Sequence, residues 1–153
     1  MRKKEKEITD QNLIEEILSS SLICRVALFD NEYPYIVPMN YGYKENTLYF
    51  HCALEGKKID LIKQNNKVGF EIEYNHEIIK NDVSCKWTTN YTSIIGNGVI
   101  EIVSDYKEKI AGLDILMQQH GKIENEYIDG AVRQALILKL NIKQLTGKQS
   151  VLY

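Results

Sequence analysis

The spacing of apolar residues predicts a helix near the start of the chain and strand-like patterns after it. Between residues 10 and 20 the apolar positions recur at the i, i+3, i+4 spacing of one helical face, and they are Leu13, Ile14, Ile17 and Leu18. Thr9 or Asp10 can cap the free amides at the start of this helix. A dense apolar run at 22–29 follows and ends at the turn residues Asp30-Asn31-Glu32, which predicts a first strand.

The next two apolar segments predict strands that are joined as a hairpin. Residues 33–43 and 47–51 flank the turn residues Lys44-Glu45-Asn46, and strands this close in sequence pair antiparallel. Pro34 and Pro38 lie in the first of them. We therefore expect an edge strand or a local irregularity there, because proline cannot donate a ladder hydrogen bond.

The second half of the chain predicts three more strands. Residues 67–74 alternate between apolar and polar side chains, as a half-buried strand does. Strands are also expected at 91–103 and at 135–145. Gly96 and Gly98 lie inside the former, which suggests a bulge or a close approach of two backbones.

Two more helices and a loop are predicted between these strands. A short helix is expected at 56–65, and a longer one at 105–120, capped by Ser104 and ended by Gly121. The apolar stripe of the longer helix consists of Ile110, Leu113 and Met117. Residues 76–86 are polar and are expected to form a loop.

The order of the predicted elements is helix, three strands, helix, two strands, helix and strand. Hairpin connections exclude a doubly wound parallel sheet, whose strands need long crossovers. About six antiparallel strands with few helices favour a mainly β fold, a small Greek-key barrel. Ten Tyr against three Phe and one Trp also suit a sheet, because the rings pack on a pleated face while the hydroxyls reach water. No repeat or linker divides the chain, so residues 1–153 are expected to form a single domain.

Charge and cysteine content narrow the class of function. The net charge of −2 argues against a protein that binds nucleic acid by neutralising its phosphates. No stretch reaches the ~18 apolar residues of a membrane span, and the charged N-terminus lacks the apolar core of a secretory signal. Cys24, Cys52 and Cys85 are an odd and widely spaced set, which favours reduced thiols and a cytoplasmic location. The chain contains neither the C-x-x-C nor the H-x3–5-H spacing that would indicate a zinc site.

Four motifs in the chain, taken in order, resemble those of one family. They are Val37-Pro38-Met39-Asn40, Tyr49-Phe50-His51-Cys52-Ala53, Glu55-Gly56-Lys57-Lys58-Ile59-Asp60-Leu61, and Trp87 through Tyr91-Thr92-Ser93-Ile94-Ile95-Gly96. Together they resemble the pyridoxamine 5′-phosphate oxidase-like superfamily of FMN-binding split barrels, and more narrowly its 5-nitroimidazole resistance (Nim) branch. The resemblance covers nearly the whole chain. It implies a six-stranded antiparallel Greek-key split β-barrel with flanking helices.

The resemblance also implies a site for a flavin, FMN or alternatively FAD. It assigns Lys57 and Lys58 to the FMN phosphate, and lysines that follow Gly56 at a predicted helix start would add charge to its free amides. Without the resemblance, these could be two surface lysines of a helix. Residues 37–40 would lie beside the flavin ring, as the matching strand does in relatives. Asn40 could equally belong to an edge strand whose proline prevents aggregation.

The remaining site residues come from the second and fourth motifs. His51 is the catalytic candidate and a flavin contact, because the matching histidine of Nim-like relatives faces the flavin and histidine can donate a proton near neutral pH. A histidine at a strand end could otherwise be structural. Ser93 and Ile94 match the signature W-x-x-x-Y-x-S-[IV]-[IV]-G, in which Ser93 would bond the phosphate or the ring. Trp87 and Tyr91 would line the pocket, or lie in the core or at a dimer interface.

The resemblance further implies a homodimer with each flavin at the subunit interface. Such a protein would take electrons from NADH or NADPH and reduce a small acceptor, conceivably a nitro-aromatic compound. Oxidation of pyridoxamine phosphate itself is not expected, since no second basic cluster accompanies Lys148 near the closing strand. The alternative is a non-catalytic flavin- or haem-binding protein, in which His51, His76 or His120 would be an axial ligand.

Overall fold

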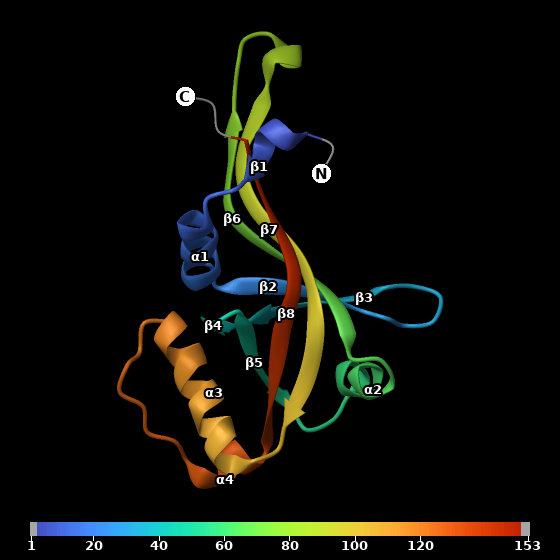
Figure 1. Ribbon diagram of the computed structural model, residues 1–153, viewed down its shortest axis with the longest axis vertical. Coiled ribbons are helices and arrows are strands. Elements are labelled where there is room, and N and C mark those ends of the chain that lie inside the picture. Colours follow the sequence, from blue (N-terminus) through green and yellow to red (C-terminus); the bar gives the residue numbers. More distant parts are fainter. Residues whose placement is uncertain (1–2, 151–153) are drawn as a thin grey trace.

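An antiparallel sheet with helices packed along it forms the framework of the protein (Figure 1). The computed structural model describes residues 3–150. The strands follow the order β3-β2-β6-β7-β8-β5-β4, β1 also pairs with β8, and every pair is antiparallel. They are β1 (Glu7–Ile8), β2 (Ile23–Leu28), β3 (Tyr35–Asn40), β4 (Gly42–Lys44), β5 (Thr47–Ala53), β6 (Lys67–Ile79), β7 (Thr88–Val103) and β8 (Ala135–Ser150).

The mainly β, antiparallel fold expected from the sequence is confirmed, with two short strands added to the six predicted. The sheet is not closed, because β3 and β4 end it and do not pair with each other in the part that the structure describes. The first added strand, β1, pairs with the far end of β8. The second, β4, arises because the predicted strand at 33–43 breaks at Tyr41. This side chain is fully buried, and its hydroxyl donates to the carbonyl of Leu18 at 2.8 Å.

Within residues 3–150, four helices lie against the sheet, and two single turns of 3-10 helix are found at Lys4–Lys6 and Ser84–Lys86. The helices are α1 (Gln11–Ser20), α2 (Lys57–Gln64), α3 (Tyr106–Gln119) and α4 (Asp129–Arg133). As expected, α1 is capped by Asp10, whose carboxylate accepts from the amide of Asn12 at 2.9 Å. None of the helices in the described range is long and apolar enough to cross a membrane.

The start and the buried face of α3 differ from the prediction. Its cap is Asp105 instead of Ser104, and the Asp105 carboxylate accepts from the amide of Glu108 at 3.0 Å. A carboxylate is the better cap here because its charge also complements the helix dipole. The face turned inward carries Lys109, Gly112 and Leu116, whereas the predicted stripe is only half-buried. The helix approaches β8 so closely that a Cβ at Gly112 would lie 2.7 Å from Ile137, which leaves room for glycine alone.

The core lies on the inner face of the sheet, and both α1 and α2 contribute buried residues to it. The alternation predicted for 67–74 is confirmed, because Val68, Phe70 and Ile72 are buried and their neighbours on β6 are more exposed. The bulge predicted near Gly96 and Gly98 is also confirmed. The β7–β8 register shifts between Asn97 and Gly98, and a Cβ at Gly96 would overlap the Phe70 ring.

The hairpin of β6 and β7 continues beyond the rest of the sheet as a projecting arm, residues 75–90 (Figure 1). The prediction of a loop at 76–86 is therefore wrong for its first part, since β6 runs to Ile79 and Ile78 pairs with Thr89. Both faces of this arm are open to solvent, so pairing there does not require the alternation by which strands are recognised in sequence. The exposed side chains of the arm include Ile78, Val83 and Trp87.

Candidate functional site

The start of α2 is built to leave its first amides free. Gly56 precedes the helix with φ 123° and ψ 166°, a conformation that is essentially restricted to glycine. Among the described residues no side chain caps the helix, and the amide of Ile59 donates to the carbonyl of Gly56 at 2.8 Å. The amides of Lys57 and Lys58 are therefore the ones left for a ligand. An uncapped N-terminus carries a partial positive charge and favours an anion.

Both lysines at this helix start reach toward β3, the edge strand of the sheet. Lys57 forms an ion pair with Asp30 at 2.5 Å, and its Nζ lies 5.0 Å from the centroid of the Tyr35 ring. The hydrogen bond from Lys57 to Asp30 raises the pKa of Lys57. Lys58 donates to the sulfur of Met39 at 3.2 Å. The structure thus brings the two predicted phosphate lysines together with the strand predicted to lie beside a flavin ring.

The predicted segment 37–40 presents side chains on both faces of β3. Met39 is buried and Val37 is half-buried on the core side, while Pro38 and Asn40 are exposed on the outer face. The expectation of an edge strand is confirmed, since β3 ends the sheet and Pro38 pairs only with Arg25 of β2. Its missing N–H therefore removes no bond from an interior ladder.

His51 lies on β5 and is exposed, opposite Ile137 of β8. Within the described range its side chain forms no hydrogen bond or ion pair. The next residue, Cys52, is half-buried near Lys58. Burial raises the pKa of the Cys52 thiol, and the Lys58 ammonium opposes that rise. Because side chains alternate along a strand, His51 points to the other face of β5 from Cys52, and a single chain does not direct it at the two lysines.

Ser93 and Ile94 lie apart from the lysines in a single chain. They belong to β7, and two strands, β2 and β6, separate β7 from β3. At a strand spacing of ~4.8 Å this separation is about 14 Å along the sheet. Ser93 is half-buried on the outer face, whereas Ile94 is completely buried, so its side chain packs in the core and only its backbone is available to a ligand.

The two aromatic residues of the same motif lie on the projecting arm and at its base. Trp87 is exposed, and its indole N–H donates to the carbonyl of Asn81 at 2.6 Å. Tyr91 is half-buried between two lysine ammonium groups, those of Lys6 and Lys148. Neither residue belongs to the core, so the alternative that Trp87 and Tyr91 are core residues is excluded.

A shallow apolar groove on the outer face of the sheet was not predicted. It has a volume of about 350 Å³ and is lined by Arg25, Ala27, Ile36, Gly69, Phe70, Glu71, Ile95 and Gly96. Two large side chains of this face are strongly exposed, Ile36 at 61% and Ile95 at 60%. A signal for this groove is present in the sequence, because these strands carry apolar residues on both faces. A strand with one solvent-exposed face would instead alternate between apolar and polar residues.

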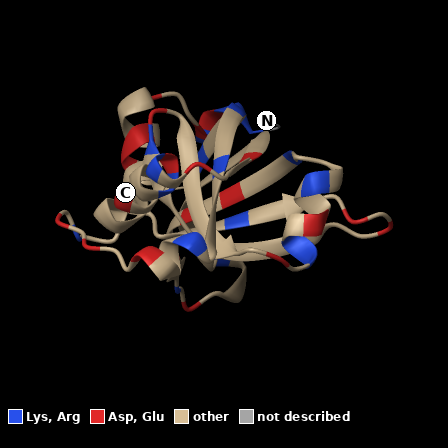
Figure 2. Cartoon of the chain, turned by 90° about the horizontal axis from the view of Figure 1, so that it is seen from below, with Lys and Arg blue, Asp and Glu red and all other residues tan. Residues whose placement is uncertain are grey.

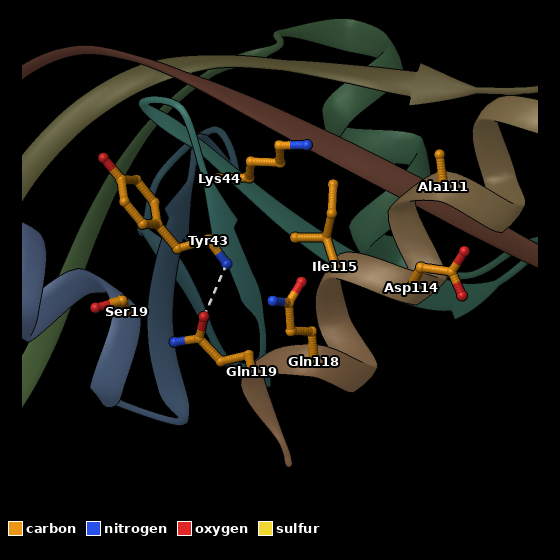
Figure 3. Close-up of a pocket in the computed structure, with 8 residues that line it drawn as sticks. All are labelled: Ser19, Tyr43, Lys44, Ala111, Asp114, Ile115, Gln118 and Gln119. Carbon is orange, nitrogen blue, oxygen red and sulfur yellow. Dashed lines mark hydrogen bonds between the residues drawn. The ribbon is translucent and has the colours of Figure 1, made fainter. Parts of the chain in front are cut away.

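A larger cavity of about 700 Å³ lies between α1, α3 and β4, and none of the predicted site residues lines it (Figure 3). Several of its polar groups are already bonded to the protein. Gln119 accepts from the amide of Tyr43 at 3.0 Å and donates to the carbonyls of Leu18 and Ser21. Asp114 accepts from Asn125 and Tyr127. The cavity is therefore a structural junction with few groups left for a ligand.

Charged residues of both signs are interspersed over the chain in Figure 2, so the lysines of α2 do not belong to a general basic face. Among the described residues, no group of three or more His, Cys, Asp and Glu side chains could hold a metal ion.

Comparisons with known proteins agree on the fold and the family. A family model described as pyridoxamine 5′-phosphate oxidase matches residues 10–149. The crystal structure of a candidate 5-nitroimidazole antibiotic resistance protein from Bacteroides thetaiotaomicron is 35% identical, with 94% of this chain and 86% of that chain covered and a TM-score of 0.84. No curated protein is significantly similar to the chain.

Two more distant structures share the fold alone. The FAD and haem binding protein from Mycobacterium smegmatis is 18% identical, with 97% of this chain and 75% of that chain covered and a TM-score of 0.85. A flavocytochrome from Azotobacter vinelandii is 15% identical, with 99% and 72% covered and a TM-score of 0.83. The split-barrel architecture expected from the sequence motifs is thereby confirmed.

Proposed function

Because the chain belongs to the pyridoxamine 5′-phosphate oxidase family, we propose that it is a flavin-dependent oxidoreductase that binds FMN at the start of α2 and along β3. The observation that supports this proposal is the pair Lys57 and Lys58 at an uncapped helix N-terminus, with contacts to Tyr35 and Met39 of β3. Flavin- and haem-binding proteins share the fold.

The start of α2 fits the phosphate of FMN. That group carries about two negative charges, and free helix amides together with two ammonium groups are the donors that it prefers. Asp30 holds Lys57 in the absence of a ligand, so the phosphate would replace or share this carboxylate. FAD would use the same donors for its pyrophosphate. Separate titrations with FMN and FAD distinguish the two flavins.

The proposed active form is a homodimer. His51, Ser93 and the two lysines do not converge in one chain, and a second copy would bring the missing groups to each site. The apolar groove with Ile36 and Ile95 is the surface that such a copy would cover, because monomers rarely leave large apolar side chains of this kind exposed together. A two-fold axis through this face would create two identical sites.

The bound flavin would supply two-electron chemistry, and the side chains would position the reactants. NADH or NADPH is the proposed electron donor. The proposed substrate is a small electron acceptor, and nitro-aromatic compounds are one class to test. His51 is exposed, and in this proposal it donates a proton to the reduced acceptor. The protein is proposed to work in the cytoplasm, without nucleic acid or membrane as partner.

An absorption spectrum of the purified protein tests the proposal. The protein is mixed separately with FMN, FAD and haemin, and NADH or NADPH is then added without oxygen. Tight FMN binding followed by bleaching of the flavin bands would support it. A Soret band with haemin and no flavin binding would favour the haem-binding alternative and refute it.

The double variant K57A/K58A tests the phosphate assignment. We expect FMN affinity to fall by roughly two orders of magnitude, because two charge-assisted contacts are lost. The matched control is K63A/K67A, which removes the same charge from two exposed lysines beyond the helix start. Equal affinities of both variants in a fluorescence titration would remove the phosphate from α2. Sedimentation of the wild type measures the dimer in the same samples.

A further inference from the structure

Two lysines from opposite ends of the chain meet on one aromatic ring at the base of the arm. The Nζ of Lys6 lies 5.7 Å from the centroid of the Tyr91 ring, and that of Lys148 lies 5.3 Å from it. Lys6 belongs to the 3-10 turn before β1, Tyr91 to β7 and Lys148 to β8. Pairing of β1 with β8 and of β8 with β7 brings these three segments side by side.

Within the described residues, neither ammonium group forms an ion pair with a carboxylate. The ion pairs within residues 3–150 involve Arg25, Lys57 and Arg133, and neither Lys6 nor Lys148 takes part in one. Lys6 donates to the hydroxyl of Ser150 at 2.6 Å, which fixes its position without cancelling its charge. Two like charges held near one ring repel each other, and an anion between them would relieve the repulsion.

Two other polar residues lie beside the pair. Ser93 is paired with Lys148, and His76 is paired with Tyr91 from the β6 side. Two carboxylates limit the positive region, since Glu7 pairs with Lys148 and Glu73 pairs with Ser93 and lies 3.8 Å from Arg25. A positive region of this small extent suits one compact anion and does not suit a polyanion such as nucleic acid.

We propose that Lys6, Tyr91 and Lys148 form a second anion site, which binds the phosphate group of a small molecule. This site is separate from the start of α2. The proposal does not depend on flavin binding at α2. The phosphate could come from a flavin held mainly by a second copy of the chain or from a nicotinamide dinucleotide. Both sources offer the same charged oxygens to the lysines and the ring edge. The sequence shows no basic residues next to Lys148 that would form a second basic cluster. In the fold, Lys6 lies beside Lys148 and supplies the second charge.

Titration of inorganic phosphate and pyrophosphate into the K57A/K58A protein tests this site, because that background removes the lysines of α2. Calorimetry at constant ionic strength measures the affinity. We expect K6Q/K148Q, added to this background, to weaken binding about tenfold or more. The control K4Q/K143Q removes the same charge from the same turn and the same strand, at exposed positions away from Tyr91, and should leave the affinity within about twofold.

Equal losses in the two variants, or no phosphate binding in the K57A/K58A background, would overturn the proposal. If K6Q/K148Q does not fold by circular dichroism, Tyr91→Leu gives the same test by removing the ring. Competition then identifies the source. Displacement of phosphate by FMN supports the flavin, displacement by NADH and not by FMN supports the nicotinamide donor, and displacement by neither overturns the assignment to such a ligand.

Discussion

Gly56→Ala tests how the start of α2 is held in place. The backbone at Gly56 has φ 123° and ψ 166°, and residues with a side chain adopt this region at a cost of about 1–3 kcal/mol. An added Cβ would meet no atom within 4 Å, so steric overlap contributes nothing and the whole effect is backbone strain. For a domain of this size, about 2–4 °C are lost per kcal/mol, and we expect the melting temperature to fall by roughly 2–12 °C.

The same variant should weaken FMN binding, because the strain is relieved if the first turn of α2 moves and misdirects its amides. Thermal unfolding followed by circular dichroism and a fluorescence titration with FMN measure the two effects. Gly130→Ala is the control without strain, since its Cβ also enters open space and its φ is not positive. Because Gly130 lies in α4, this variant should raise stability by up to about 1 kcal/mol and leave FMN affinity unchanged. Gly121→Ala has a positive φ of 87° far from α2 and should lower stability alone. Unchanged stability and unchanged FMN affinity in Gly56→Ala would refute the reasoning.

Two further predictions concern the proposed site. Asp30→Asn should lower the pKa of Lys57 and raise FMN affinity severalfold in a fluorescence titration, because a carboxylate that competes with the phosphate is removed; weaker binding would instead mean that Asp30 positions Lys57. His51→Ala should retain FMN and slow reduction of the acceptor ~10²-fold or more in stopped-flow experiments. Rates equal to those of the wild type would make His51 a structural residue.

The parts of the fold that sequence patterns predicted correctly are those specified by neighbouring residues. The cap at Asp10 and the alternation of Val68, Phe70 and Ile72 depend on local spacing, and both are present. The arm was missed because its side chains are solvated on both faces and carry no period. The inward face of α3 was missed because a glycine, Gly112, selects it by allowing the closest approach to β8, and hydrophobicity does not report that.

The candidate site divides in the same way. Lys58 contacts Met39 and Lys57 contacts Tyr35 of the same strand, because a single motif places both lysines at the start of α2. Ser93 lies elsewhere, because the order of strands in the sheet fixes its distance from β3 and no local signal encodes that order. Lys6 and Lys148 could not be associated from sequence, since only the pairing of β1 with β8 makes them neighbours.

The central place of β8 in the sheet has a consequence for biosynthesis. This strand is late in the chain, yet it pairs with β7, β5 and β1, which are all made before it. Until residues 135–150 leave the ribosome, β7 and β5 each expose a row of unpaired backbone groups that could join another nascent chain. β1 therefore lacks its pairing partner until residues 135–150 have been made. Completion of the sheet therefore requires residues 135–150, and ribosome-bound chains truncated before residue 135 should be sensitive to protease.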